Sequence, residues 1–246
     1  MKKLVAYITS AYPDKEFTKD LILSLKEHGT DSVELGIPFS DPVADGPVIE
    51  EANLRALKKG FRFQDVLDIT KDVSCSIDTL WMGYFNPFYK RGLQRVAKEA
   101  KELGVTGFII PDMPYEESLG YRGHFDKEGL PLITFVAPTD SKERISLIVK
   151  DAKKFIYLVA YAGITGASKS EDLKEIIENI REFSQTPIYL GFGVDEKSAK
   201  AKAKDVDGVI VGSAFVKILL DDSLTLSEKI DKISSLSGKI KELINS

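Results

Sequence analysis

Residues 32–59 of the sequence read SVELGIPFSDPVADGPVIEEANLRALKK and contain one complete strand, loop and helix. Ser32–Leu35 has the composition of a short strand, and the prolines and glycines that follow it indicate a loop. Pro47 suits the first position of a helix, and Pro47–Lys59 is amphipathic and charged. A strand followed by a helix is the repeating unit of a parallel sheet.

The same unit recurs along the chain. The predicted strands are Leu4–Thr9, Ser32–Leu35, Ile77–Met82, Gly107–Ile110, Leu132–Val136, Phe155–Val159, Ile188–Leu190 and Gly208–Val211. The predicted helices are Lys15–Glu27, Pro47–Lys59, Gly92–Leu103, Glu116–Lys127, Lys142–Lys150, Ser170–Phe183, Glu196–Lys202 and Leu226–Ile244, with a short one at Ser213–Leu219. Eight such units in 246 residues predict a (β/α)8 TIM barrel that forms a single domain over residues 1–246. The alternative, an open doubly wound sheet, often has a G-x-G-x-x-G turn after the first strand, and none is present here.

The composition narrows the classes of function. The 34 Lys and Arg residues are outnumbered by 38 Asp and Glu residues, and a net charge of −4 argues against binding to nucleic acid. Cys75 is the only cysteine, and His28 and His124 are far apart, so the sequence predicts neither a disulfide nor a metal site. The apolar start is too short for a signal peptide, and no apolar run approaches a membrane span. We expect a cytoplasmic protein without membrane contact.

Glu34 stands out within its strand. Side chains of a barrel strand alternate between the lumen and the helix layer, so if Val33 and Leu35 face the helices, Glu34 points into the lumen. It lies at the C-terminal end of the strand, which is the catalytic face of this fold. A structural role in a backbone network is one interpretation. The other is a general acid/base, because burial raises a carboxyl pKa toward neutrality.

Two further acids follow in the loop. Asp45 ends this proline-rich segment, and it either caps the helix that begins at Pro47 or contacts a substrate. Asp41 precedes Pro42 and is more typical of turn chemistry. After the fourth strand, Asp112 offers a similar choice between a loop contact and a cap.

Glycine-rich loops follow three late strands, at residues 162–167, 191–194 and 212–214. Glycine lets backbone N–H groups approach an anion closely, and a short helix from Ser213 would point its N-terminus at the same place. Barrels of this kind often bind phosphate in the loops after strands seven and eight. The pattern therefore predicts a phosphorylated ligand. The small, polar segment 163–170 also suits a mobile lid.

The aromatic residues Tyr7, Tyr157 and Phe192 lie on or next to strands of this predicted barrel. They either line an aromatic pocket or simply fill the core, as most buried aromatic residues do.

Several of these segments together resemble one family. VELGIPFSDPVADGP resembles the signature of the tryptophan synthase alpha chain. YITSAYP, IIPDMPYEES, YAGITGAS, GFGV and IVGSAFVKIL resemble, in the same order, the family's first strand, its fourth strand and loop, its sixth and seventh loops, and its eighth strand. The resemblance covers nearly the whole chain.

The resemblance implies a lyase that cleaves indole-3-glycerol phosphate into indole and glyceraldehyde 3-phosphate by a retro-aldol reaction. It implies that Glu34 is the acid/base and that Asp45 binds the indole N–H. It places phosphate binding at Gly166, Gly193, Gly212 and Ser213, and the substrate pocket at Tyr7, Tyr157, Thr165 and Phe192. The alpha chain itself is expected to need no metal or organic cofactor. Its expected partner is a beta chain that holds pyridoxal phosphate and receives indole directly, in an alpha2beta2 complex.

Two features depart from the family's pattern. Many members have a helix before the first strand that covers the barrel floor, whereas only three residues precede Leu4 here, so we expect either that other residues cover this end or that it is more open. Tyr161 stands where members often have a smaller or basic residue, which affects the expected lid.

Two alternative functions remain open. The chain could be another phosphate-binding barrel enzyme, such as indole-glycerol-phosphate synthase or a sugar-phosphate isomerase, or a non-catalytic partner that regulates a beta chain.

Overall fold

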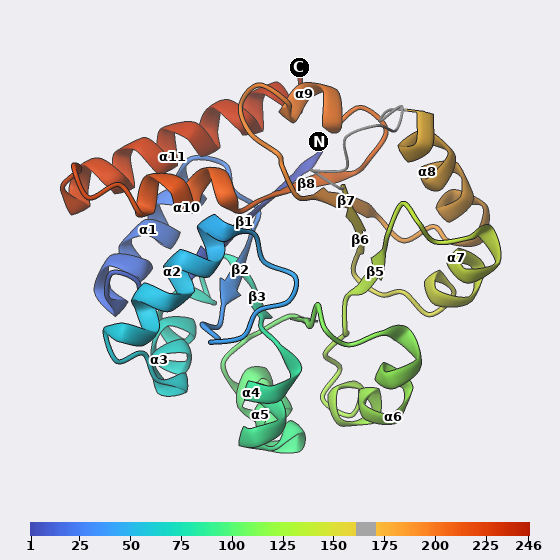
Figure 1. The fold of residues 1–246 in the computed structure, drawn as a ribbon, viewed down its shortest axis with the longest axis horizontal. Coiled ribbons are helices and arrows are strands. Elements are labelled where there is room, and N and C mark those ends of the chain that lie inside the picture. Colours follow the sequence, from blue (N-terminus) through green and yellow to red (C-terminus); the bar gives the residue numbers. More distant parts are fainter. Residues whose placement is uncertain (161–170) are drawn as a thin grey trace.

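In a computed structural model, which describes residues 1–160 and 171–246, eight parallel strands form one sheet with helices around it (Figure 1). The strands are β1 (Lys3–Thr9), β2 (Ser32–Gly36), β3 (Asp78–Met82), β4 (Phe108–Ile109), β5 (Thr134–Val136), β6 (Ile156–Val159), β7 (Ile188–Gly191) and β8 (Gly208–Val211). Their order in the sheet is β4-β3-β2-β1-β8-β7-β6-β5. All eight predicted strands are confirmed, although β4 and β5 are shorter than expected.

The sheet closes into a barrel through a narrow contact between its two edge strands. Leu132, the expected first residue of the fifth strand, forms a single parallel bridge with Phe108 of β4. The amide of Phe108 donates to the carbonyl of Pro131 at 2.9 Å, and the amide of Ile133 donates to the carbonyl of Phe108 at 2.8 Å. The TIM barrel prediction is therefore confirmed, with its weakest seam between β4 and β5.

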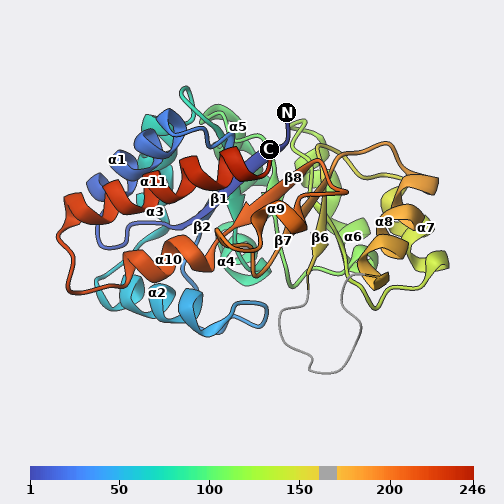
Figure 2. The same cartoon turned by 90° about the horizontal axis from the view of Figure 1, so that it is seen from above.

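The helices lie outside the strands, and Figure 2 shows this layer from a second direction. They are α1 (Lys15–Glu27), α2 (Pro47–Lys58), α3 (Phe63–Val73), α4 (Phe85–Arg91), α5 (Leu93–Glu102), α6 (Tyr115–Asp126), α7 (Lys142–Val149), α8 (Glu171–Phe183), α9 (Ala199–Lys202), α10 (Ser213–Leu219) and α11 (Leu226–Leu243). In the described part of the chain, no helix is long and apolar enough to cross a membrane.

The sequence analysis missed α3 and α4 because it assigned only one helix to the segment after β2 and one to the segment after β3. The buried side of α3 carries Val66, Ile69 and Val73 at helical spacing, and Asp65 accepts a bond from the amide of Arg62 at 2.8 Å. In α4, Pro87 lies in the first turn, where the missing N–H breaks no helical hydrogen bond. The helix predicted at Glu196–Lys202 is shorter, because Asp195 and Ser198 bond to each other's amides in a turn before α9.

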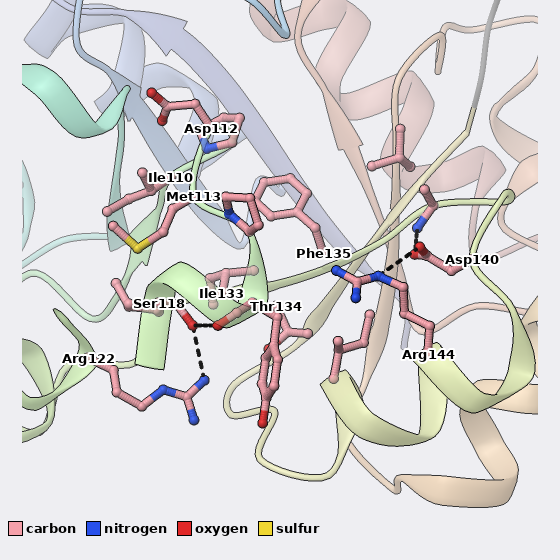
Figure 3. A pocket seen from close by; sticks show the side chains of 17 residues that line it. Ile110, Asp112, Met113, Ser118, Arg122, Ile133, Thr134, Phe135, Asp140 and Arg144 are labelled. Atoms are coloured by element: carbon pink, nitrogen blue, oxygen red, sulfur yellow. Dashed lines mark hydrogen bonds and ion pairs between the residues drawn. The ribbon is translucent and has the colours of Figure 1, made fainter. Parts of the chain in front are cut away.

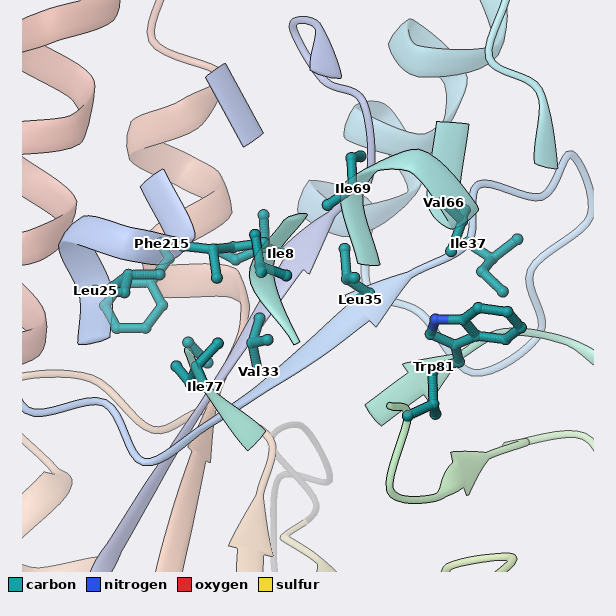
Figure 4. Packing of buried hydrophobic residues seen from close by; sticks show 14 of the residues in the cluster. Ile8, Leu25, Val33, Leu35, Ile37, Val66, Ile69, Ile77, Trp81 and Phe215 are labelled. Atoms are coloured by element: carbon teal, nitrogen blue, oxygen red, sulfur yellow. The ribbon is translucent and has the colours of Figure 1, made fainter. Parts of the chain in front are cut away.

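The strand side chains divide as the alternation predicts. Val33 and Leu35 are fully buried in the cluster that also contains helix residues such as Leu25 and Ile69 (Figure 4). The lumen holds a separate apolar cluster with side chains from β1, β3, β6 and β8, including Tyr7 and Leu80. Glu34 lies between these two residues in the strand register, so its lumen position is confirmed.

The floor of the barrel, at the N-terminal ends of the strands, carries polar and aromatic side chains. The ammonium of Lys154 donates to Asp78 and to Thr106, both at 2.9 Å. Phe155 stacks on Tyr189 with ring centroids 4.4 Å apart. These contacts cover part of the floor, and a hollow of about 740 Å³ lined by Lys3, Tyr189 and Asp207 lies at the same end of the barrel.

Candidate active site

Glu34 is held in the lumen without a polar partner. Its side chain is fully buried, and neither carboxyl oxygen has a hydrogen-bond partner among the described residues. Burial in these surroundings raises its pKa from the ordinary 4.5 to about 8. A structural role in a backbone network would give the carboxyl such partners. A group with this pKa can gain and lose a proton near neutral pH.

Asp45 approaches Glu34's cavity from the loop between β2 and α2. The capping alternative is wrong, because the N-cap of α2 is Gly46 and no side chain caps it. Instead, the carboxylate accepts a hydrogen bond from the amide of Asn53 at 3.1 Å. Burial, and to a smaller extent the nearby charge of Glu50, raise the pKa of Asp45, whereas hydrogen bonds with Tyr84 and Asn53 lower it. The raising effects are larger, so the pKa of Asp45 is about 6. The surroundings therefore separate the two groups, with the pKa of Asp45 below neutral pH and that of Glu34 above it.

The two acids line one small cavity of about 40 Å³. Predicted residues that share its wall are Tyr7, Tyr157, Phe192, Gly193, Gly212 and Ser213. Residues that the sequence analysis did not name also line it, among them Ile49, Met82 and Ile210. Met82 and Ile210 lie in strands whose alternation could have placed them there, whereas Ile49 required the packing of α2. Thr165, Gly166, Tyr161 and the lid expected at residues 163–170 lie outside the described residues.

The glycine sites come from two neighbouring strands. Gly193 follows β7 with a φ of +66°, a conformation that favours glycine, and Phe192 before it has a φ of +72° although it carries a side chain. Gly212 follows β8 directly and is the N-cap of α10. The carbonyl of Gly193 accepts a hydrogen bond from the ammonium of Lys202 at 2.5 Å. Lys202 thus places a positive charge beside this turn, which the sequence analysis did not predict.

The aromatic residues are both core and cavity wall. Tyr7 and Tyr157 are buried in the lumen, and burial raises the pKa of both phenols well above the ordinary value. The ring of Tyr157 stacks on Phe135 at 4.9 Å and meets Phe192 edge-on at 6.1 Å. These aromatic residues therefore fill the core and also line the cavity, so both interpretations of them are correct.

A larger cavity of about 270 Å³ lies beside the β4–β5 seam (Figure 3). Its arginines are engaged, since Arg144 pairs with Glu116 at 2.6 Å and Arg122 pairs with Asp151 at 3.3 Å. Asp112 accepts a hydrogen bond from the amide of Phe85 at 2.8 Å, so it is a loop contact to the first amide of α4. Because this cavity lacks a buried acid without a partner, the smaller one around Glu34 is the better candidate for catalysis. In residues 1–160 and 171–246, no cluster of three metal-ligating side chains occurs.

Comparisons with known proteins agree with this geometry. The family model of the tryptophan synthase alpha chain matches residues 1–245. A tryptophan synthase alpha chain from Wolinella succinogenes is 59% identical over 247 residues, which cover 100% of this chain and 97% of the relative. Tryptophan synthase subunit alpha from Campylobacter jejuni is similar in structure, with a TM-score of 0.87, 33% identity, and coverage of 96% of this chain and 95% of the other. For Mycobacterium tuberculosis tryptophan synthase the TM-score is 0.89, with 30% identity and coverage of 100% and 93%. The chain therefore belongs to the tryptophan synthase alpha chain family.

Proposed function

We propose that the chain, a lyase by its family, cleaves indole-3-glycerol phosphate into indole and glyceraldehyde 3-phosphate, with Glu34 and Asp45 as the catalytic residues. The observation that supports this assignment most is a fully buried Glu34 without a hydrogen-bond partner, in the same cavity as Asp45. Two carboxyl groups whose surroundings separate their pKa values can take different roles in one reaction.

The chemistry divides between the two acids. The carboxyl of Glu34 gives its proton to C3 of the indole ring, which places positive charge on the ring system. The ionised Asp45 binds the ring N–H and stabilises this charge. Glu34, now a base, removes the proton of the side-chain hydroxyl next to C3. The carbon–carbon bond then breaks, its electron pair returns to the ring, and the hydroxyl oxygen becomes the aldehyde carbonyl of glyceraldehyde 3-phosphate.

The remaining cavity residues hold the substrate in this proposal. Gly193, Gly212 and Ser213 bind the phosphate through backbone N–H groups, together with Gly166. Tyr7, Tyr157 and Phe192 enclose the indole ring, together with Thr165. None of these steps needs a metal or an organic cofactor on this chain.

The partner in this proposal is a tryptophan synthase beta chain with pyridoxal phosphate, in an alpha2beta2 complex that receives indole directly for tryptophan biosynthesis. Val43, at 79% exposure, presents an apolar side chain on the same loop as Asp45. That loop is therefore a suitable contact for the partner. We place the complex in the cytoplasm. The chain would act as one domain, because β1 pairs with both β2 and β8 and so joins the two halves of the chain.

The direct test is incubation of the purified chain with indole-3-glycerol phosphate, with and without a beta chain, while indole is measured. We expect indole in both cases, and its loss in a folded Glu34→Gln variant. Another phosphate-binding barrel enzyme would consume or ignore this substrate without releasing indole. A non-catalytic regulator would release none even with the beta chain bound.

A further inference from the structure

One side chain on the buried face of α2 is polar. The buried residues of this helix are Ile49, Ala52, Asn53 and Ala56, at the spacing of an inward-facing stripe. Asn53 is 2% exposed. A polar amide is unexpected in this stripe, because apolar side chains occupy the other three buried positions.

A contribution of Asn53 to the stability of the fold does not explain its presence. The Oδ1 atom of Asn53 is buried and has no hydrogen-bond partner among the described residues. A buried acceptor without a partner lowers stability, and asparagine is also a weak helix former. Where a residue breaks such local rules without compensation nearby, a functional site is the usual reason.

The amide nitrogen of Asn53 has one clear partner. Nδ2 donates to Oδ2 of Asp45 at 3.1 Å. The opposite orientation of the amide would turn its oxygen toward the carboxylate, and two acceptors repel each other. Helix α2 contacts both β1 and α10, and Figure 2 shows α2 and α10 side by side. The donor therefore stands on a helix that the barrel wall supports, whereas its acceptor stands on a loop.

A second anchor holds the same loop from another element. The hydroxyl oxygen of Tyr84, between β3 and α4, accepts a hydrogen bond from the amide of Ala44 at 3.0 Å. Tyr84 fixes the backbone next to Asp45, and Asn53 contacts one carboxylate oxygen. The carboxylate of Asp45 also hydrogen-bonds with the hydroxyl of Tyr84 and lines the cavity, so Asn53 and Tyr84 together orient it beside a ligand there.

We propose that Asn53 is a positioning residue that binds Oδ2 of Asp45 and so directs Oδ1 toward the ring N–H of the substrate. The inference rests on the proposed role of Asp45 in indole-3-glycerol phosphate cleavage. An amide suits this task because it does not ionise and therefore donates at every pH.

Loss of the donor changes the charge balance around Asp45. The groups that face this carboxylate are Glu50 on α2, Tyr84 after β3, and Glu34, Tyr7 and Tyr157 in the lumen. None of these side chains is a cation. A carboxylate that loses a hydrogen bond in such surroundings becomes harder to ionise, so the pKa of Asp45 rises by about 1 unit.

The test compares Asn53→Leu and Asn53→Ala with Ala56→Gly, a control on the same buried stripe. Asn53→Leu keeps most of the side-chain volume and removes the donor, and Asn53→Ala is the second variant in case leucine does not fit. We expect kcat/KM for indole-3-glycerol phosphate to fall about tenfold or more, mainly through kcat, because the charge on the ring develops after binding. We also expect the acid limb of the pH profile to move up by about 1 pH unit. Ala56→Gly lowers the melting temperature without moving this limb.

The pKa of Asp45 is also measured directly, by titration of its side-chain carbon signal in nuclear magnetic resonance spectra, with Asp45→Asn for assignment. An upward shift in Asn53→Leu or Asn53→Ala supports the positioning role even if the wild-type chain releases no indole, in which case only the proposed reaction fails. An unchanged pKa of Asp45 in both variants overturns the inference. A loss of activity that follows the melting temperature, with the same pH limb, also overturns it.

Discussion

The ring of Tyr157 covers Gly191 so closely that a β-carbon at Gly191 would lie 2.3 Å from the phenol oxygen. The same relationship joins Tyr7 to Gly36, again at 2.3 Å. Tyr157 is paired with Tyr189 in the strand register, and its ring covers Gly191, two residues further along β7. In the same way Tyr7 is paired with Glu34, and its ring covers Gly36, two residues further along β2. Glycine at these two strand ends therefore creates the space in which both phenols lie in the lumen beside Glu34.

Gly191→Ala tests this relationship. The added methyl group displaces the ring of Tyr157, so we expect a loss of about 1–3 kcal/mol in the free energy of unfolding, which is typical of overpacking. We also expect a clear fall in kcat/KM, because the displaced ring enters the cavity. Chemical denaturation and an indole-release assay measure the two effects.

The matched control is the double variant with Tyr157→Leu. A shorter side chain leaves room for the methyl group, so the two substitutions together should cost less stability than the sum of their separate effects. Additive effects on stability would show that the ring and Gly191 do not constrain each other.

Glu34→Gln should change how stability depends on pH. The folded-state pKa of Glu34, about 8, lies above its ordinary value of 4.5, so the unfolded chain ionises first. The contribution of Glu34 to stability is therefore present below pH 4.5 and is lost as the pH rises from 4.5 to 8, by about 1.4 kcal/mol per pH unit. Urea unfolding of both proteins between pH 5 and 8, at closely spaced values, measures this difference. Parallel curves would mean that Glu34 titrates normally in the folded protein.

Gly212→Asp should weaken phosphate binding more cleanly than a change at Gly193. The φ of Gly193 is +66°, so any side chain there also strains the backbone, whereas a β-carbon at Gly212 meets its nearest atoms at 3.4 Å without a clash. The new carboxylate repels a phosphate, and Gly212→Ala is the control that adds only a methyl group. Calorimetry with glycerol phosphate should show a large loss of affinity for Gly212→Asp and a small one for Gly212→Ala. Equal affinities would place the phosphate elsewhere.

A beta chain should raise the turnover of this chain substantially. Asp45 stands on a loop that exposes Ser40, Asp41 and Val43, the last at 79%, and a partner that packs there favours its ordered state. By reciprocity, a glycerol-phosphate analogue bound to this chain should tighten the binding of the beta chain, where 1.4 kcal/mol corresponds to about tenfold. The measurements are beta-chain affinity with and without the analogue, and indole release at saturating beta chain. If neither changes, the two sites are not coupled.

Local patterns were sufficient for the barrel and for the direction of Glu34. A strand alternates its side chains with a period of two whatever surrounds it, so Val33 and Leu35 alone predicted that Glu34 faces the lumen. The same local signals, applied as one helix for each strand, passed over α3 and α4, although the apolar spacing of α3 is visible in the sequence.

The surroundings of Asp45 were decided only by the tertiary structure. In the sequence, an aspartate just before a helix that starts with proline is a good N-cap, and no local signal separates that role from a substrate contact. Asn53 and Tyr84 meet Asp45 because α2 packs against the barrel wall and because the loops after β2 and β3 leave the same rim. The sequence by itself therefore determined which strand carries the buried acid. Only the packing of distant segments determined its low-dielectric surroundings and the hydrogen bonds of the second acid, because both depend on atoms that the chain brings together from far apart.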